Sequence, residues 1–315
     1  MGCVRTLTCR FASSRRRPRR RQRRLAKSHP LAKLAITVGD PRGIGPEVVA
    51  AALADPRVIS AAEYVVVPHH GTWSPGVSVA EAGRVAGAAV VRAVELALAG
   101  EVDGIVTAPL DKFALREGGY DFPGHTEMLA ELTRSRVAMM LASDRLRVVL
   151  ATTHIPLREV PKAVTQSGII QTAQITREGL RAWFGIAEPR LALCALNPHA
   201  GDGGRFGDED DRILAPAARA AGLAGPFPAD TVFVRAIRGE FDAVVTPYHD
   251  VGMTAIKVAS FGEAVNVTLG LPFPRTSPDH GTAMDIAGRG IADPSSMIAA
   301  ILMCTAIVQR QCDAH

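Results

Sequence analysis

The chain has 315 residues, of which 47% are hydrophobic, so it is long enough to form one large domain or two. Its longest apolar stretches have the length of strands and fall far short of the ~20 residues of a membrane-spanning helix, which predicts a soluble protein. The formal net charge is +5, but residues 1–33 contain 12 of the 36 Lys and Arg and no Asp or Glu. Residues 34–315 therefore carry 24 basic and 31 acidic side chains, a net charge of −7 that argues against nucleic-acid binding by the body of the protein.

Residues 1–33 form a basic tail, with eight Arg in the ten positions 15–24. A disordered arm is one interpretation, because like charges repel and the tail has little apolar surface to bury. A targeting peptide and translated upstream sequence are two others, and we favour the last, with the domain starting near Leu31. The five cysteines are odd in number and include no CxxC, which is typical of a reducing compartment and favours the cytoplasm.

The predicted elements alternate between strands and helices. In chain order they are a strand at 34–38, a helix at 48–53, a strand at 64–67, a helix at about 78–99, a strand at 102–107 and a helix that begins near residue 125. Strands at 138–141 and 146–152 then form a hairpin, followed by a helix at 160–184, a strand at 191–196, helices at 207–221 and 230–238, and strands at 243–246 and 265–269. A last helix, at about 295–309, is apolar on most faces and should pack into the core or an interface. This alternation predicts an α/β protein with a largely parallel sheet.

Three histidines each follow an apolar run that predicts a buried strand: His154, His199 and His249. In open α/β sheets, ligands bind at the carboxyl ends of the strands. Three neutral imidazoles that converge there would suit a divalent metal with an open position for substrate. The alternative is three unrelated histidines, one or two of them hydrogen-bonded in the core. Their three equivalent positions favour the metal site.

Three further segments carry ligand-binding features. GDPRGIGPE at 39–47 places three glycines at a strand-to-helix turn, which is typical either of a loop against a ligand or of a plain connection, and it lacks the GxGxxG spacing of a Rossmann site. FPGHTEM at 122–128 places His125 and Thr126 at a helix start, which favours phosphate binding, although Thr126 could simply cap the helix. Downstream lie a cation, an amide and a guanidinium, those of Lys257, Asn266 and Arg275. Together they suit a small anionic substrate, and the alternative is that they belong to a solvated surface.

These segments together resemble the 4-hydroxythreonine-4-phosphate dehydrogenase family of pyridoxal phosphate biosynthesis. The matching strings run in family order from about residue 34 to residue 293: GDPRGIGPE, VTAPLDK, FPGHTEM, THIPLREV, NPHAGDGG, FGDED, PYHDVG and VNVTLGLPFPRTSPDHGTAMDIAGRG. The segment HGTAMDIAGRGIADP at 280–294 is similar to the nucleotide loop of isocitrate and isopropylmalate dehydrogenases. The resemblance implies a two-domain α/β fold of that dehydrogenase type, with mostly parallel sheets around a central cleft. Residues 34–125 and 261–315 would form the first domain and residues 126–260 the second.

The resemblance also implies the site residues. A divalent metal (Zn, Mg or Co), shared across a homodimer interface, would be held by His154, His199 and His249. The substrate would contact His125, Thr126, Lys257, Asn266 and Arg275, with Lys257 also the candidate acid/base catalyst. The nucleotide, NAD or NADP, would bind His280, Gly281, Thr282, Ala283, Asp285 and Ile286.

The implied reaction is the oxidation of 4-phosphooxy-L-threonine to 2-amino-3-oxo-4-phosphooxybutanoate, which decarboxylates to 3-amino-2-oxopropyl phosphate. The sequence departs from the family pattern at Val38, Arg42 and Val251, where Met, Ala and Gln are usual, and in a shortened segment before residue 102. These departures bear on substrate choice, so a dehydrogenase of D-threonate or D-erythronate 4-phosphate is the alternative. A non-catalytic nucleic-acid binder with a basic tail is a further alternative, and the complete set of site residues argues against it. We therefore expect neither a membrane nor a specific nucleic acid as a partner.

Overall fold

The computed structural model describes residues 31–67, 73–260 and 262–313, and the predicted basic tail lies almost wholly outside them. The strands are β1 (Ala32–Thr37), β2 (Ala62–Val67), β3 (Gly104–Thr107), β4 (Ala138–Ala142), β5 (Arg147–Leu150), β6 (Leu191–Cys194), β7 (Ala224–Phe227), β8 (Ala243–Thr246), β9 (Val265–Leu269) and β10 (Arg275–Pro278). The helices are α1 (Gly45–Leu53), α2 (Pro56–Ile59), α3 (Val79–Ala99), α4 (Lys112–Glu117), α5 (His125–Thr133), α6 (Val160–Ala163), α7 (Gln166–Phe184), α8 (Ala215–Ala221), α9 (Ala229–Ile237), α10 (His249–Ala259) and α11 (Ser295–Asp313). Short 3-10 turns occupy Leu157–Glu159 and Pro198–Gly201, and a π-helical turn occupies Asp210–Leu214.

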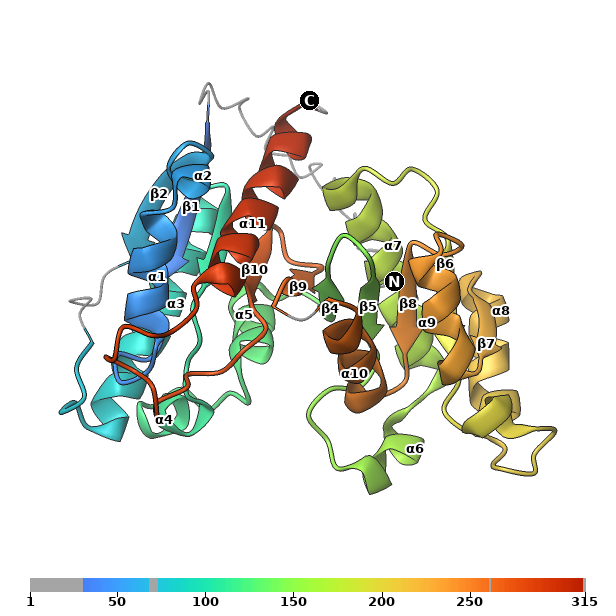
Figure 1. Cartoon of the computed structure of the whole chain (residues 1–315). Helices are drawn as coiled ribbons and strands as arrows, with labels where there is room; N and C mark the ends of the chain where they lie inside the picture. Colours follow the sequence, from blue (N-terminus) through green and yellow to red (C-terminus); the bar gives the residue numbers. More distant parts are fainter. Residues whose placement is uncertain (1–30, 68–72, 261, 314–315) are drawn as a thin grey trace, which may run out of the picture.

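All ten strands form one sheet, in the order β2-β1-β3-β10-β9-β4-β5-β8-β6-β7. The strands from β2 to β10 and from β5 to β7 pair in parallel, whereas β10, β9, β4 and β5 pair antiparallel in the middle. Figure 1 shows α1, α3 and α11 around the first parallel part and α7, α8 and α9 around the second. The prediction of an α/β protein with a mostly parallel sheet is confirmed, and the antiparallel centre joins its two parts.

Two of the predicted helices have other bounds in the structure, and α2, α4 and α10 were not predicted. The predicted helix at 160–184 is interrupted at Val164, which has an extended conformation, and α7 starts anew because the Thr165 side chain accepts a hydrogen bond from the Gly168 amide. The predicted helix at 207–221 begins only at Asp210, in the π-helical turn that leads into α8. Two short strands, β7 and β10, were not predicted, because AGPF and RTSP lack the apolar pattern of a buried strand.

The C-terminal helix α11 belongs to the core, as its apolar faces predicted. Met297, Ile301 and Ile307 are fully buried, and the helix packs against β10, β3 and α7. Within the described residues, α11 alone has the length and composition of a membrane-spanning helix. Its contacts with the sheet identify it as a core helix instead.

Candidate active site

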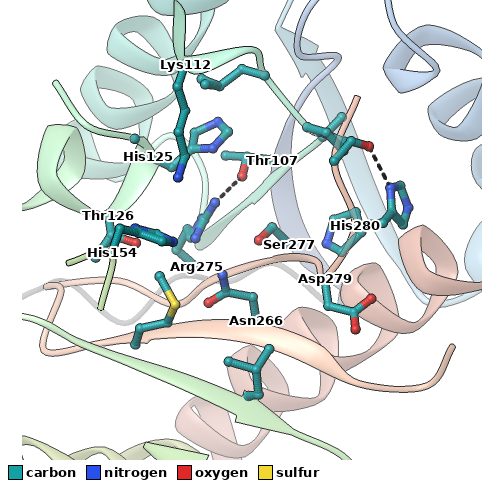
Figure 2. Close-up of a pocket in the computed structure, with 18 of the residues that line it drawn as sticks. Thr107, Lys112, His125, Thr126, His154, Asn266, Arg275, Ser277, Asp279 and His280 are labelled. Carbon is teal, nitrogen blue, oxygen red and sulfur yellow. Dashed lines mark hydrogen bonds between the residues drawn. The ribbon is translucent and has the colours of Figure 1, made fainter. Parts of the chain in front are cut away.

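A cavity of about 280 Å³ lies over one face of the centre of the sheet. Side chains two residues apart on a strand point to the same face, so the strand register decides which residues line the cavity. On β9 and β4, Asn266 lies directly opposite Leu141, and on β10 Ser277 lies directly opposite Asn266. Arg275 lies two residues before Ser277 and therefore shares its face, so the sheet itself brings Asn266 and Arg275 together in the cavity, as Figure 2 shows.

Arg275 is a buried cation held by neutral groups. Its side chain is 1% exposed, and it donates hydrogen bonds to the hydroxyl oxygens of Thr107 on β3 (2.5 Å) and Thr268 on β9 (3.0 Å). Its Nε is buried without a hydrogen-bond partner. Burial lowers the pKa of the guanidinium to about 10, so it keeps its charge at neutral pH. Because hydroxyls do not neutralise that charge, the cavity attracts an anion.

The start of α5 forms the neighbouring wall. Gly124 is the N-cap and contributes no side-chain hydrogen bond, so the interpretation of Thr126 as the N-cap is wrong. Thr126 is 8% exposed and lines the cavity, and the Nε2 of His125 is buried without a partner. Burial, and then the positive charges of Arg275 and Lys112, hold the pKa of His125 well below its usual value. A neutral imidazole and the free N–H groups of a helix N-terminus therefore face the same space as Arg275.

Two of the three predicted metal ligands lie together. The ring centroids of His154, which follows β5, and His249, which begins α10, are 5.5 Å apart, and both side chains line the cavity. Partial burial, followed by the charge of Lys112, lowers the pKa of His154. The Nδ1 of His249 lies 2.7 Å from the Asp250 carboxylate, an arrangement that fixes the ring and leaves Nε2 free for a ligand.

His199 lies apart from this pair. It stands on the loop after β6, next to the Phe206 ring at 6.2 Å between centroids, and it does not line the cavity. Among the described residues, no group of three or more His, Cys, Asp or Glu side chains is placed to hold a metal. One chain therefore presents a pair of imidazoles, and the role of His199 stays a prediction.

Lys257 reaches the edge of the site through a carboxylate. Its Nζ lies 3.6 Å from an oxygen of Asp279, which lines the cavity, but Lys257 itself does not line it. Lys257 is partly exposed on α10, in the turn before the helix ends.

The predicted nucleotide loop begins at the cavity and continues away from it. His280 and Gly281 line the cavity, whereas the rest of the predicted set extends beyond it: Thr282, Ala283, Asp285 and Ile286. The segment 39–47 supports this loop, since the Ile44 amide donates to the Thr282 carbonyl at 2.9 Å and Glu47 accepts from the Gly290 amide at 3.2 Å. A Cβ at Gly43 would stand 2.7 Å from the Thr282 carbonyl oxygen, so only glycine allows this contact.

The departures from the family pattern lie away from the cavity lining. Val38 is 4% exposed in the core, and Val251 is half-buried against the smaller hydrophobic cluster under α10. Arg42 makes a two-point hydrogen bond with the buried carboxylate of Asp40 (3.0 and 2.6 Å).

Sequence reasoning missed several residues that line the cavity: Thr107, Lys112, Glu127, Ser277 and Asp279. A signal existed for the first two, because both stand in VTAPLDK at the end of a predicted strand. Ser277 and Asp279 belong to β10 and the loop after it, and that strand was not predicted.

The fold defines a class of protein. It is similar to the solved structure of a β-decarboxylating dehydrogenase from Thermococcus kodakarensis, with a TM-score of 0.51 and 17% identity over 87% of this chain and 82% of that one. The predicted isocitrate/isopropylmalate dehydrogenase type of fold is thereby confirmed.

The family is narrower than this class. The model of the pyridoxal phosphate biosynthetic protein PdxA matches residues 26–304, and the chain belongs to that family. It is 43% identical to a 4-hydroxythreonine-4-phosphate dehydrogenase of Desulfosudis oleivorans, over 90% of this chain and 98% of that protein. The crystal structure of the Klebsiella pneumoniae enzyme of the same name superposes with a TM-score of 0.79 at 38% identity, covering 90% of this chain and 100% of that one. The chain is therefore an oxidoreductase, as its motifs predicted.

Proposed function

We propose that the chain oxidises 4-phosphooxy-L-threonine with NAD or NADP as hydride acceptor, giving 2-amino-3-oxo-4-phosphooxybutanoate, which loses CO2 to form 3-amino-2-oxopropyl phosphate. The observation that carries this proposal is the cavity around Arg275, where a buried cation has no ion-pair partner among the described residues and faces the free end of α5. Such a cavity suits a small polyanion, and family membership supplies the reaction.

His125 and Thr126 bind the phosphate group, and Asn266 and Arg275 hold the remaining polar groups of the substrate. The support for these roles is the common cavity together with the buried, unpartnered atoms His125 Nε2, Asn266 Oδ1 and Arg275 Nε. Unpaired polar atoms in a buried site are costly unless a ligand satisfies them.

His154 and His249 fit a divalent cation, because both imidazoles face the cavity and a carboxylate orients one of them. Lewis-acid polarisation of the reacting oxygen is the chemistry that such a cation supplies. His199 would complete the set from a second subunit, which makes the enzyme a homodimer with a shared site. The cation is zinc, magnesium or cobalt.

The residues that would hold the nicotinamide nucleotide are those of 280–286, because His280 and Gly281 line the same cavity as the proposed substrate residues, and the nucleotide would supply hydride transfer there. Lys257, beside Asp279, is the acid/base group that exchanges a proton with the reacting hydroxyl. Leu141 and Met139 make part of the cavity lining apolar, which would limit water there. A soluble biosynthetic enzyme with these cofactors would work in the cytoplasm.

The test compares turnover of 4-phosphooxy-L-threonine with that of D-erythronate 4-phosphate and D-threonate 4-phosphate, each with NAD and with NADP. We expect the highest kcat/KM for 4-phosphooxy-L-threonine. A higher value for a sugar-acid phosphate would overturn the substrate assignment and leave the dehydrogenase class intact.

A further inference from the structure

Lys112 is a cation at the cavity for which the established reaction has no assigned role. It is the first residue of α4, directly after Asp111, whose side chain caps that helix by accepting from the Ala114 amide at 2.7 Å. The Lys112 side chain crosses to the start of α5, where its Cε would lie 3.5 Å from a Cβ built on Gly124. Figure 2 shows it running beside the His125 ring towards the Arg275 guanidinium.

The charge of Lys112 is not neutralised within the described part of the chain. Lys112 forms no ion pair there, and the neighbouring Asp111 faces Arg42 instead, at 3.9 Å. Its positive charge acts on the cavity, because it is among the causes that lower the pKa of the adjacent His125.

The balance of charge at this end of the cavity is positive. Arg275 is bonded only to hydroxyls, and His125 is neutral. Two carboxylates line the cavity, and one of them, Asp279, is paired with Lys257. Glu127 alone therefore faces two cations and the positive end of the α5 dipole.

We propose that Lys112 binds the phosphate group of the substrate together with His125 and Thr126 at the start of α5. This inference rests on the proposed function, in which the substrate is phosphorylated. A phosphate dianion at a helix N-terminus accepts from backbone N–H groups and a neutral imidazole on one side. An ammonium group on a flexible stem supplies the compensating charge from another direction, without the fixed planar geometry of a guanidinium.

The position of Gly124 fits this assignment. With no side chain at the N-cap, the space beside the first α5 amides is open, and it is bordered by Lys112 Cε at 3.5 Å and by Glu127 Oε2 at 3.4 Å from the position that a Cβ would take. Arg275 then remains free for the other polar groups of the substrate.

The experiment replaces Lys112 by Met and by Arg in the full chain, with Arg116→Met as the matched control. Arg116 carries the same charge one turn later on α4, pairs with Asp121 at 3.5 Å and does not line the cavity. Two quantities are measured: kcat/KM for 4-phosphooxy-L-threonine and for 4-hydroxy-L-threonine, and the Kd of inorganic phosphate by calorimetry.

We expect Lys112→Met to lower kcat/KM for the phosphorylated substrate about 10-fold and to weaken phosphate binding by a similar factor. This is the lower end of the range for a charge-assisted hydrogen bond, because the lysine is solvent-exposed. Lys112→Arg should recover most of both, and Arg116→Met should change neither. The KM for the nucleotide should stay the same.

Equal losses on the phosphorylated and unphosphorylated substrates, or equal effects of Lys112→Met and Arg116→Met, would overturn the assignment. A wild type that binds phosphate but turns over no phosphorylated substrate would contradict the proposed function instead, and the phosphate Kd of Lys112→Met would still decide the role of Lys112.

Discussion

Arg275 illustrates how a buried charge can be kept available for a ligand. Taking a guanidinium out of water is costly, and proteins usually offset that cost with a carboxylate. Here the two partners are the hydroxyls of Thr107 and Thr268, which orient the group without cancelling its charge. The binding of an anion then supplies the missing compensation, so part of the stability of this region depends on the ligand.

His125 gives the site a pH dependence with a definite sign. Burial lowers its folded-state pKa well below the unfolded value of about 6.5, so the unfolded chain binds the extra proton first. This contribution to stability is fully present above pH 6.5 and is lost as the pH falls below it, by at most about 1.4 kcal/mol per pH unit. Between pH 7.5 and pH 5.5, we expect the free energy of unfolding of the wild type to fall by about 1 kcal/mol more than that of His125→Gln. The measurement is urea unfolding in the presence of EDTA.

The comparison removes the titrations that the two proteins share, including that of His154, which has a lowered pKa in both. Parallel stability curves for wild type and His125→Gln would show that His125 is not the group responsible.

Single site residues were the part of the site most accessible to sequence reasoning. His125, Thr126, Asn266 and Arg275 were selected from chemistry and motif, and all four line one cavity. Thr107 was not selected, because its role depends on β3 lying next to β10, a pairing between residues more than 160 positions apart in sequence. The sequence likewise could not show that Lys257 meets the cavity only through Asp279.

At the scale of elements, the loop after β6 carries the predicted site residue His199. Among the described segments with predicted site residues, this loop has the most strained backbone. His199, Ala200 and Asp202 all have positive φ (53°, 54° and 46°), a conformation that costs free energy for residues other than glycine. The fully buried carboxylate of Asp210 holds the start of this loop by accepting from the Leu196 and Asn197 amides at 2.8 and 2.9 Å and from the Asn197 side chain at 3.0 Å.

We predict that Asp210→Asn destabilises the protein by about 1–3 kcal/mol, because an amide cannot accept all three bonds and leaves buried donors unpaired. The conservative change at the exposed Asp208, Asp208→Asn, should cost well under 1 kcal/mol, since it only weakens a surface pair with Arg212. The measurement is the free energy of unfolding in urea. Similar values for the two variants would show that the Asp210 bonds do not fix the loop.

Strands and helices were predicted correctly where a buried apolar pattern determines the element. They were predicted less accurately where single hydrogen bonds determine the element's bounds. The strands β1, β4, β6, β8 and β9 carry Val, Leu and Ala on buried faces, and their predicted positions are confirmed. The break before α7 coincides with one capping threonine, and the first residue of the π-helical turn, Asp210, is hydrogen-bonded to the loop after β6. Neither feature changes the apolar pattern, so periodicity could not show them.

At the scale of the whole molecule, the sheet is continuous across the predicted domain boundary. β9, assigned to the first domain, pairs with β10 of that domain and with β4 of the second. The cavity lies over this junction, which explains why its lining residues come from both predicted domains. The division into two domains stays a prediction. The predicted hairpin of β4 and β5 is confirmed, whereas the antiparallel pairing of β9 with β4, which joins the two parts, was not predicted.

The separation of His199 from the other two histidines leads to a prediction about assembly. His154 and His249 share the cavity, while His199 projects from an exposed loop. If a second subunit supplies His199, then His154→Ala and His199→Ala proteins are each inactive, yet a mixed dimer contains one intact site. With random pairing from equal amounts, half of the dimers are mixed and half of their sites are intact, so about a quarter of wild-type activity should return.

Differently tagged subunits, coexpressed and assayed before and after EDTA treatment, provide the measurement. Wild-type activity that survives exhaustive chelation would contradict the metal site, whereas chelator-sensitive wild type with no recovery in the mixed dimer would place all three histidines in one subunit.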